Sequence, residues 1–99
     1  MPSRELLDTW KRTESFLREA LESVPPHLVD EYHTVLAQYA EYISHNELEL
    51  AMDTLAEVLS EAGWNRVAAA SMASAARNMG LDARAAEFEQ ELASLGGGA

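Results

Sequence analysis

The sequence contains no cysteine and only seven lysine and arginine residues among 99. Without cysteine the chain can form neither a disulfide framework nor a thiolate metal site. It also has no glycine-rich phosphate loop and no serine in a Gly-x-Ser-x-Gly setting, so the common catalytic motifs are missing. We therefore expect a protein that is not an enzyme and that uses no cofactor.

A long hydrophobic run is also missing. No segment approaches the roughly 18 apolar residues that a membrane-spanning helix needs, and the first residues, MPSRELLDTWKR, have no uninterrupted apolar stretch. Hydrophobic residues make up 47% of the chain and charged residues 24%, as in an ordinary folded domain. We expect a single cytoplasmic domain over residues 1–95 and a flexible Gly-rich tail at 96–99.

Basic residues are absent from the middle of the chain. From Glu19 to Asn65 there are ten acidic residues and no lysine or arginine, whereas seven acidic and seven basic residues lie outside this segment. The net charge of −10 therefore comes entirely from the middle segment. Its field repels nucleic acid and anionic membranes and attracts a basic protein partner.

Two helices are predicted before residue 45. Ser3 can cap a helix that runs to about Val24, and Pro25-Pro26 ends it and opens a second helix that reaches about Ser44. The short turn predicts that these two helices pack antiparallel. The inward stripes are Leu6, Leu7, Trp10, Leu17, Ala20, Leu21 and Val24 in the first helix and Leu28, Val29, Tyr32, Val35, Leu36, Tyr39 and Ile43 in the second.

Further helices are predicted in the second half. Asn46 and Glu49 form a variant capping box for a third helix, which Gly63 ends. A fourth helix, residues 65–79, ends before Gly80, and its small side chains should make it the most enclosed helix. Asp82 caps a last helix that turns Ala85, Phe88, Leu92 and Leu95 inward. No segment alternates like a half-buried strand. The expected fold is all-α, a compact bundle of four to five short helices.

The third predicted helix has an acidic stripe, defined as Glu49, Asp53, Glu57 and Glu61. These carboxylates recur every four residues on the side opposite the apolar face. Each like-charged pair costs roughly 0.2–0.5 kcal/mol, so the three pairs oppose the helix by about 1 kcal/mol. Leu50 projects into the same side, between Glu57 and Glu61 on the helical wheel.

Two interpretations of this stripe are open. The acids can be a solvated face that keeps the protein soluble, with Leu50 packed locally against Tyr42 or Ile43. An apolar residue within an acidic patch is also a common anchor at a protein interface. We favour the interface and predict that it contains Glu41, Glu47, Glu49, Leu50, Asp53, Glu57 and Glu61.

The histidines lie at spacings that occur in metal sites. Asp30 and His33 are three residues apart, and Glu41 and His45 are four apart. A di-iron carboxylate bundle needs two Glu-x-x-His units and two further inward glutamates, and this chain has one loose match. We expect no metal site; a carboxylate metalloenzyme is the alternative that a metal analysis would decide.

Residues 28–61, LVDEYHTVLAQYAEYISHNELELAMDTLAEVLSE, resemble the middle of small helical bacterial immunity proteins of the MafI and contact-dependent-inhibition kind. The similarity lies in Tyr42-Ile43, in the polar turn His45-Asn46-Glu47 and in the helix that begins with Leu50-Ala51-Met52. The family more often has a glycine at the turn, where this sequence has Asn46. The resemblance implies an antitoxin that neutralises a toxin domain, often a nuclease, by covering its basic substrate groove.

The charge pattern independently favours the same function, because a carboxylate-lined helix can fill a groove built for phosphates. We therefore expect an immunity protein whose partner is a basic toxin domain, with neither nucleic acid nor a membrane as a partner. The alternative is an adaptor of the tetratricopeptide-like helical-hairpin type, which binds a peptide in a concave apolar groove. Only binding through the acidic face should weaken steeply with salt.

Overall fold

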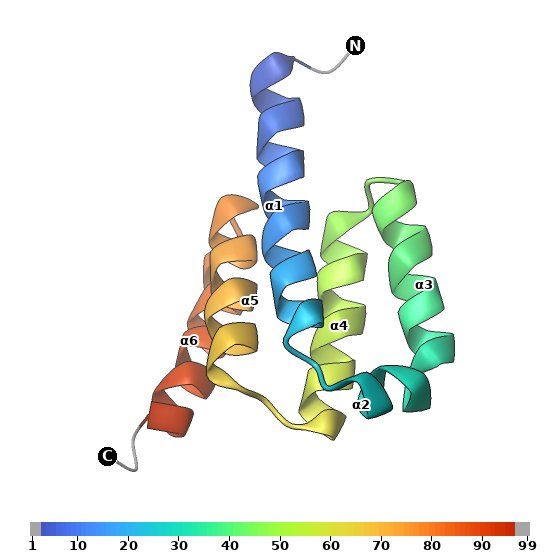
Figure 1. Ribbon diagram of the computed structural model, residues 1–99. Helices are drawn as coiled ribbons and strands as arrows, with labels where there is room; N and C mark the ends of the chain where they lie inside the picture. Colours follow the sequence, from blue (N-terminus) through green and yellow to red (C-terminus); the bar gives the residue numbers. More distant parts are fainter. Residues whose placement is uncertain (1–2, 97–99) are drawn as a thin grey trace.

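The computed structural model describes residues 3–96, and within them the chain forms an all-α bundle (Figure 1). The fold class predicted from the sequence is therefore confirmed. The helices are α1 (Arg4–Glu22), α2 (Pro26–Glu31), α3 (His33–Ser44), α4 (Leu48–Ala62), α5 (Arg66–Asn78) and α6 (Asp82–Gly96). Because α6 ends at Gly96, the helix includes the first residue assigned to the tail; residues 97–99 lie outside the described residues.

The longest helix, α1, begins at its predicted cap. The Ser3 hydroxyl accepts a hydrogen bond from the Leu6 backbone N–H at 3.1 Å, which satisfies one of the free donors of the first turn. At 19 residues α1 is about 28 Å long, and its first turns project past the ends of the neighbouring helices (Figure 1). Leu6 and Leu7 are each 41% exposed there, so their predicted burial is wrong.

The second predicted helix is two helices. Pro25 and Pro26 open α2 as predicted, but the backbone of Tyr32 (φ −100°, ψ 23°) leaves helical geometry and separates α2 from α3. Next to the break, the His33 ring Nδ1 lies 2.9 Å from the Asp30 carbonyl oxygen, a local contact between side chain and backbone that competes with regular helix. The number of helices therefore rises to six within residues 3–96.

The turns after α3 and α5 have the same geometry. After α5, Gly80 has φ +76°, and Leu81 N–H donates to the Ala76 carbonyl at 2.9 Å. After α3, Asn46 has φ +56°, and Glu47 N–H donates to the Tyr42 carbonyl at 2.9 Å. Both are Schellman endings, which place a left-handed residue just past the helix. The predicted capping box is thus wrong: Asn46 ends α3, and Glu47 occupies the N-cap position of α4.

The packing order differs from the chain order. The small-residue helix α5 packs against both α1 and α6, which confirms its enclosed position, and α3 packs against α4. Figure 1 shows α4 between α1 and α3. The predicted antiparallel pairing of the first two long helices is therefore wrong, because α1 packs mainly along α5, whose alanines allow close approach.

The core forms where these helices meet. It is centred on the fully buried Leu17, Met52, Leu55, Leu59 and Met72, and Phe88 joins it from α6. Burial of Tyr39 raises the pKa of its hydroxyl to about 12. Ala85 and Phe88 face inward as predicted, but Leu95 is exposed near the end of α6. Among residues 3–96, none of the helices combines the length and apolar character needed to span a bilayer.

Candidate functional site

The outer side of α4 carries the acidic stripe. Leu48, Ala51, Met52, Leu55, Val58 and Leu59 bury the inner side. This orientation leaves Glu49, Glu57 and Glu61 exposed, and Leu50 is 47% exposed among them. Leu50 does not belong to the core cluster. The apolar side chain therefore lies within the acidic face, as the helical wheel predicted.

Arg84 of α6 binds this stripe, although it is 31 residues away from Asp53 in the chain. Its Nη2 donates to Asp53 Oδ1 at 2.9 Å and its Nη1 donates to Glu87 Oε2 at 2.6 Å. The guanidinium Cζ also lies 4.9 Å from the centroid of the Phe88 ring, a cation–π contact. The acidic stripe therefore has a basic neighbour at Asp53, which the period of α4 alone does not reveal.

The contacts of Arg84 favour the charged form of its guanidinium. Partial burial lowers the pKa of the guanidinium, but the hydrogen bonds that it donates to Glu87 and Asp53 outweigh this effect, and the pKa is raised above its ordinary value. Both ion pairs are partly exposed, since the side chain of Arg84 is 32% exposed and that of Asp53 46%. Of the two, only the pair with Asp53 links α6 to α4, and partly exposed pairs of this kind add little to the stability of the fold.

A groove runs between α4 and α6, and we call it the acidic groove. Asp53, Ala56, Glu57, Ser60, Glu61 and Arg84 line its main part, of about 680 Å³. A smaller cavity shares Ala56, Ser60 and Arg84 and adds Trp64, Glu87, Phe88 and Glu91. Together the two linings contain five carboxylates and one guanidinium, so the acidic groove has a net charge of −4. Among residues 3–96, neither Glu57, Glu61 nor Glu91 takes part in an ion pair.

Of the seven predicted interface residues, five lie along α4, Glu47 is at its N-cap and Glu41 is on α3, so they do not form one cluster. Glu49 and Glu61 are twelve residues apart on α4, which separates them by about 18 Å. Glu41 and Glu47 lie near the beginning of α4, both exposed, and Glu61 lies near its end. Burial and the charges of Glu31 and Glu61 raise the pKa of Tyr32. Glu61 therefore acts on the α2–α3 junction, where Tyr32 lies.

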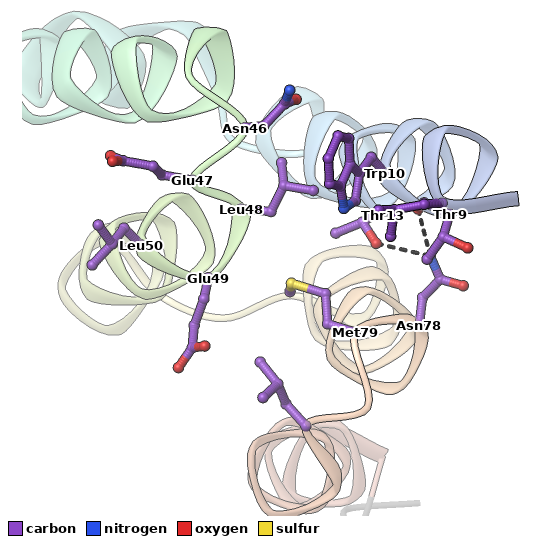
Figure 2. A pocket seen from close by; sticks show the side chains of 12 residues that line it. Thr9, Trp10, Thr13, Asn46, Glu47, Leu48, Glu49, Leu50, Asn78 and Met79 are labelled. Carbon is purple, nitrogen blue, oxygen red and sulfur yellow. Dashed lines mark hydrogen bonds between the residues drawn. The ribbon is translucent and has the colours of Figure 1, made fainter. Parts of the chain in front are cut away.

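A second concave surface lies at the end of the molecule where α1 projects, and we call it the end groove. It has a volume of about 500 Å³ and is lined by Leu6, Thr9, Trp10, Thr13, Asn46, Glu47, Leu48, Glu49, Leu50, Asn78, Met79 and Leu81. Figure 2 shows Leu48, Trp10 and Met79 facing one another, while Glu47 and Leu50 point to the other side of the first turn of α4. Sequence reasoning missed this groove because three separate segments form it.

The histidines form no metal centre in the described part of the chain. Within residues 3–96 no group of three or more His, Asp or Glu side chains is arranged to hold a metal ion. His33 is exposed, and its ring contacts the Asp30 carbonyl. The carboxylates of the acidic groove are exposed or half-exposed. The arrangement suits ion pairing with a basic surface.

Comparison of the chain with protein-family models, with curated proteins and with solved structures finds no match.

Proposed function

We propose that this protein binds a basic protein through the outer side of α4 and the acidic groove, and that it serves as an immunity protein against a cytotoxic nuclease. The single observation that carries the proposal is the acidic groove itself. Five carboxylates from two helices line it, and one arginine partly neutralises them. Three of them, Asp53, Glu57 and Glu61, belong to the acidic middle segment, and Glu87 and Glu91 come from α6.

Arg84 supports the proposal because it occupies the groove as a partner's arginine would. Its guanidinium pairs with a carboxylate from each wall and stacks on Phe88. A nuclease holds its substrate phosphates with arginine and lysine side chains, and the same side chains can pair with Glu57, Glu61 and Glu91. A partner would also relieve the repulsion that remains between Glu57 and Glu61, since Arg84 already pairs with Asp53; one such pair costs roughly 0.2–0.5 kcal/mol in an isolated helix.

Inhibition in this mechanism needs no chemistry from the immunity protein. The negative field increases the rate of encounter with the basic groove of the toxin. Once docked, the outer side of α4, about 18 Å long, lies over positions that substrate phosphates would occupy. The substrate is then excluded by charge and by volume, and Leu50 contributes an apolar contact within the charged surface.

The test is co-expression with the toxin domain encoded beside the gene, scored by colony survival and by nuclease activity of the purified pair. The parent protein should protect, whereas Glu57→Lys with Glu61→Lys should not. Glu19→Lys with Glu22→Lys is the matched control, because it makes the same change of charge at exposed positions of α1. Equal protection by both double variants, with both folded by circular dichroism, would refute the role of the acidic face.

The end groove favours a second function, that of a helical adaptor. It is a concave surface with Trp10, Leu48 and Met79 in its lining, which is the kind of site that holds a peptide side chain. Ionic strength separates the two functions. Binding through the acidic face should weaken steeply between about 50 and 500 mM salt, whereas binding in the apolar groove alone should change little.

A further inference from the structure

The end groove is held open by polar contacts between the helices that form it. The Asn78 side-chain amide, on the last residue of α5, donates to the Thr9 carbonyl and to the Thr13 hydroxyl of α1, both at 2.8 Å (Figure 2). Thr13 is fully buried. The two Schellman turns at Asn46 and Gly80 supply the remaining walls. A groove held in this way needs little ordering when a ligand binds, which favours affinity.

Apolar side chains that the core does not cover line this groove. Leu6 is 41% exposed, and Trp10, Met79 and Leu81 are each only partly buried. Their remaining exposed area would be removed from water by a side chain inserted between α1 and the turn after α5. The volume of about 500 Å³ lies within the range of pockets that hold small ligands.

A carboxylate borders the apolar lining on the α4 side. Glu49 is exposed and forms no ion pair within residues 3–96, whereas the equally exposed Glu47 side chain points away from Leu48 and Trp10 (Figure 2). Both carboxylates also stabilise the N-terminus of α4 through its dipole, so their charge alone does not identify a ligand. The combination of an apolar floor with an acidic border does, because it complements an apolar side chain that has basic neighbours.

We infer that the end groove takes leucine-type side chains from a basic amphipathic helix of the partner, with a lysine or arginine residue of that helix against Glu49. A helix presents apolar residues at i and i+4 on one face, which is the usual way in which a helix fills an apolar groove. The identity of the partner rests on the proposed function; the groove and its ligand chemistry do not. In such a complex the partner contacts the outer side of α4 and also the end groove beside the first turn of this helix.

The probe is a fluorescein-labelled helical peptide of leucine and lysine with its leucines on one face, and a peptide of the same composition with scattered leucines is the control. Leu6→Gln tests the groove, since Leu6 lines it. Leu7→Gln is the matched control, because Leu7 is equally exposed, lies on the same helix and does not line the groove. Both changes keep the charge and the helix propensity nearly constant.

The amphipathic peptide should bind more tightly than the scattered one, and Leu6→Gln should weaken it by about fivefold to tenfold, as expected for a lost leucine contact. Leu7→Gln should change its affinity by less than about twofold. In a Trp64→Phe background, Trp10 emission should shift on binding. Equal effects of the two glutamine variants, or saturable binding with unchanged Trp10 emission, would overturn the inference.

The partner assay separates this inference from the proposed function. If Glu57→Lys with Glu61→Lys abolishes protection from the toxin while Leu6→Gln and Leu7→Gln dissociate from it equally fast, the groove assignment fails and the acidic-face function stands. If Leu6→Gln weakens peptide binding and Leu7→Gln does not, while no variant affects nuclease activity, the groove assignment stands and the immunity function fails.

Discussion

The acidic groove and the end groove both use α4, but they recognise a ligand by different physical means. The acidic groove is defined by charge, and its carboxylates are exposed or half-exposed and act at distances set by salt. The end groove is defined by shape and apolar contact, and side-chain hydrogen bonds from Asn78 hold its walls. Charge of this kind sets the rate of encounter, whereas close apolar contact sets the rate of dissociation.

This difference has a structural origin. The side chains on the outer side of α4 are placed by one helix, so local periodicity decides which of them face water. The end groove needs α1, the α3–α4 turn and the α5–α6 turn together. Disruption of the tertiary contacts should therefore damage the end groove first and leave the acidic stripe intact.

The largest expected effect is that of Asn78→Ala, which should lower the free energy of unfolding by about 1–3 kcal/mol. The change leaves the buried Thr13 hydroxyl without its donor and removes the link between α5 and α1. A urea melt measures the loss, and binding of the leucine–lysine peptide should weaken in parallel.

Asn65→Ala is the control for Asn78→Ala. Asn65 caps α5 at its other end, where its Oδ1 accepts from Ala68 N–H at 2.8 Å and its Nδ2 donates to Ser23 Oγ at 3.1 Å. It should cost a similar stability and leave peptide affinity unchanged under conditions where the protein is folded. Equal loss of peptide binding in both variants would mean that global stability, and not the shape of the groove, controls binding.

A smaller effect is expected for Leu50→Ala. Because Leu50 is 47% exposed and outside the core cluster, the change should cost less than about 1 kcal/mol of stability. If Leu50 anchors the toxin, the dissociation rate in stopped-flow binding should rise by about fivefold while the association rate stays constant. Val67→Ala, at a similarly exposed position of α5, is the control. Unchanged dissociation would show that the charges act without an apolar anchor.

The third prediction tests the role of Arg84 in partner binding. If this arginine competes with the partner for Asp53 and Glu87, Arg84→Gln should tighten toxin binding by about threefold, beyond what the added negative charge alone produces. Arg77→Gln makes the same change of charge on α5, where Arg77 pairs with Glu89 outside the acidic groove. Equal tightening in both variants would show that net charge alone matters, and a weaker Arg84→Gln complex would show that Arg84 shapes the binding surface.

The smallest effect concerns the free protein in salt. Screening should weaken the repulsion among Glu49, Glu57 and Glu61, so the melting temperature should rise by about 1–3 °C between low salt and a few hundred millimolar sodium chloride. The rise is limited because Arg84 already neutralises Asp53. Glu57→Gln with Glu61→Gln should flatten the curve. A falling curve for the parent would mean that the ion pairs of Arg84, Arg77 and Arg18 outweigh the repulsion.

Several local features were predicted correctly from the sequence. The Ser3 cap, the proline start at Pro26 and the glycine ending at Gly80 depend on hydrogen bonds within a few residues. The exposure of Leu50 follows from the period of one helix. Asn46 shows the limit of such reasoning, because asparagine suits both a helix start and a left-handed helix end, and only the observed φ of +56° distinguishes them.

By itself, then, the amino-acid sequence determined the all-α class, the enclosed position of α5 and the acidic outer side of α4, because side-chain size, charge and helical period are properties of short segments. Only the tertiary structure decided that α1 packs along α5, that Arg84 pairs with Asp53, and that Leu6, Leu48 and Met79 border one groove. The helices α1, α3, α4 and α5 each bury apolar residues, and the period of one helix does not say which of the other helices covers them. The choice among them depends on the fit of side chains far apart in the sequence, which no local pattern records.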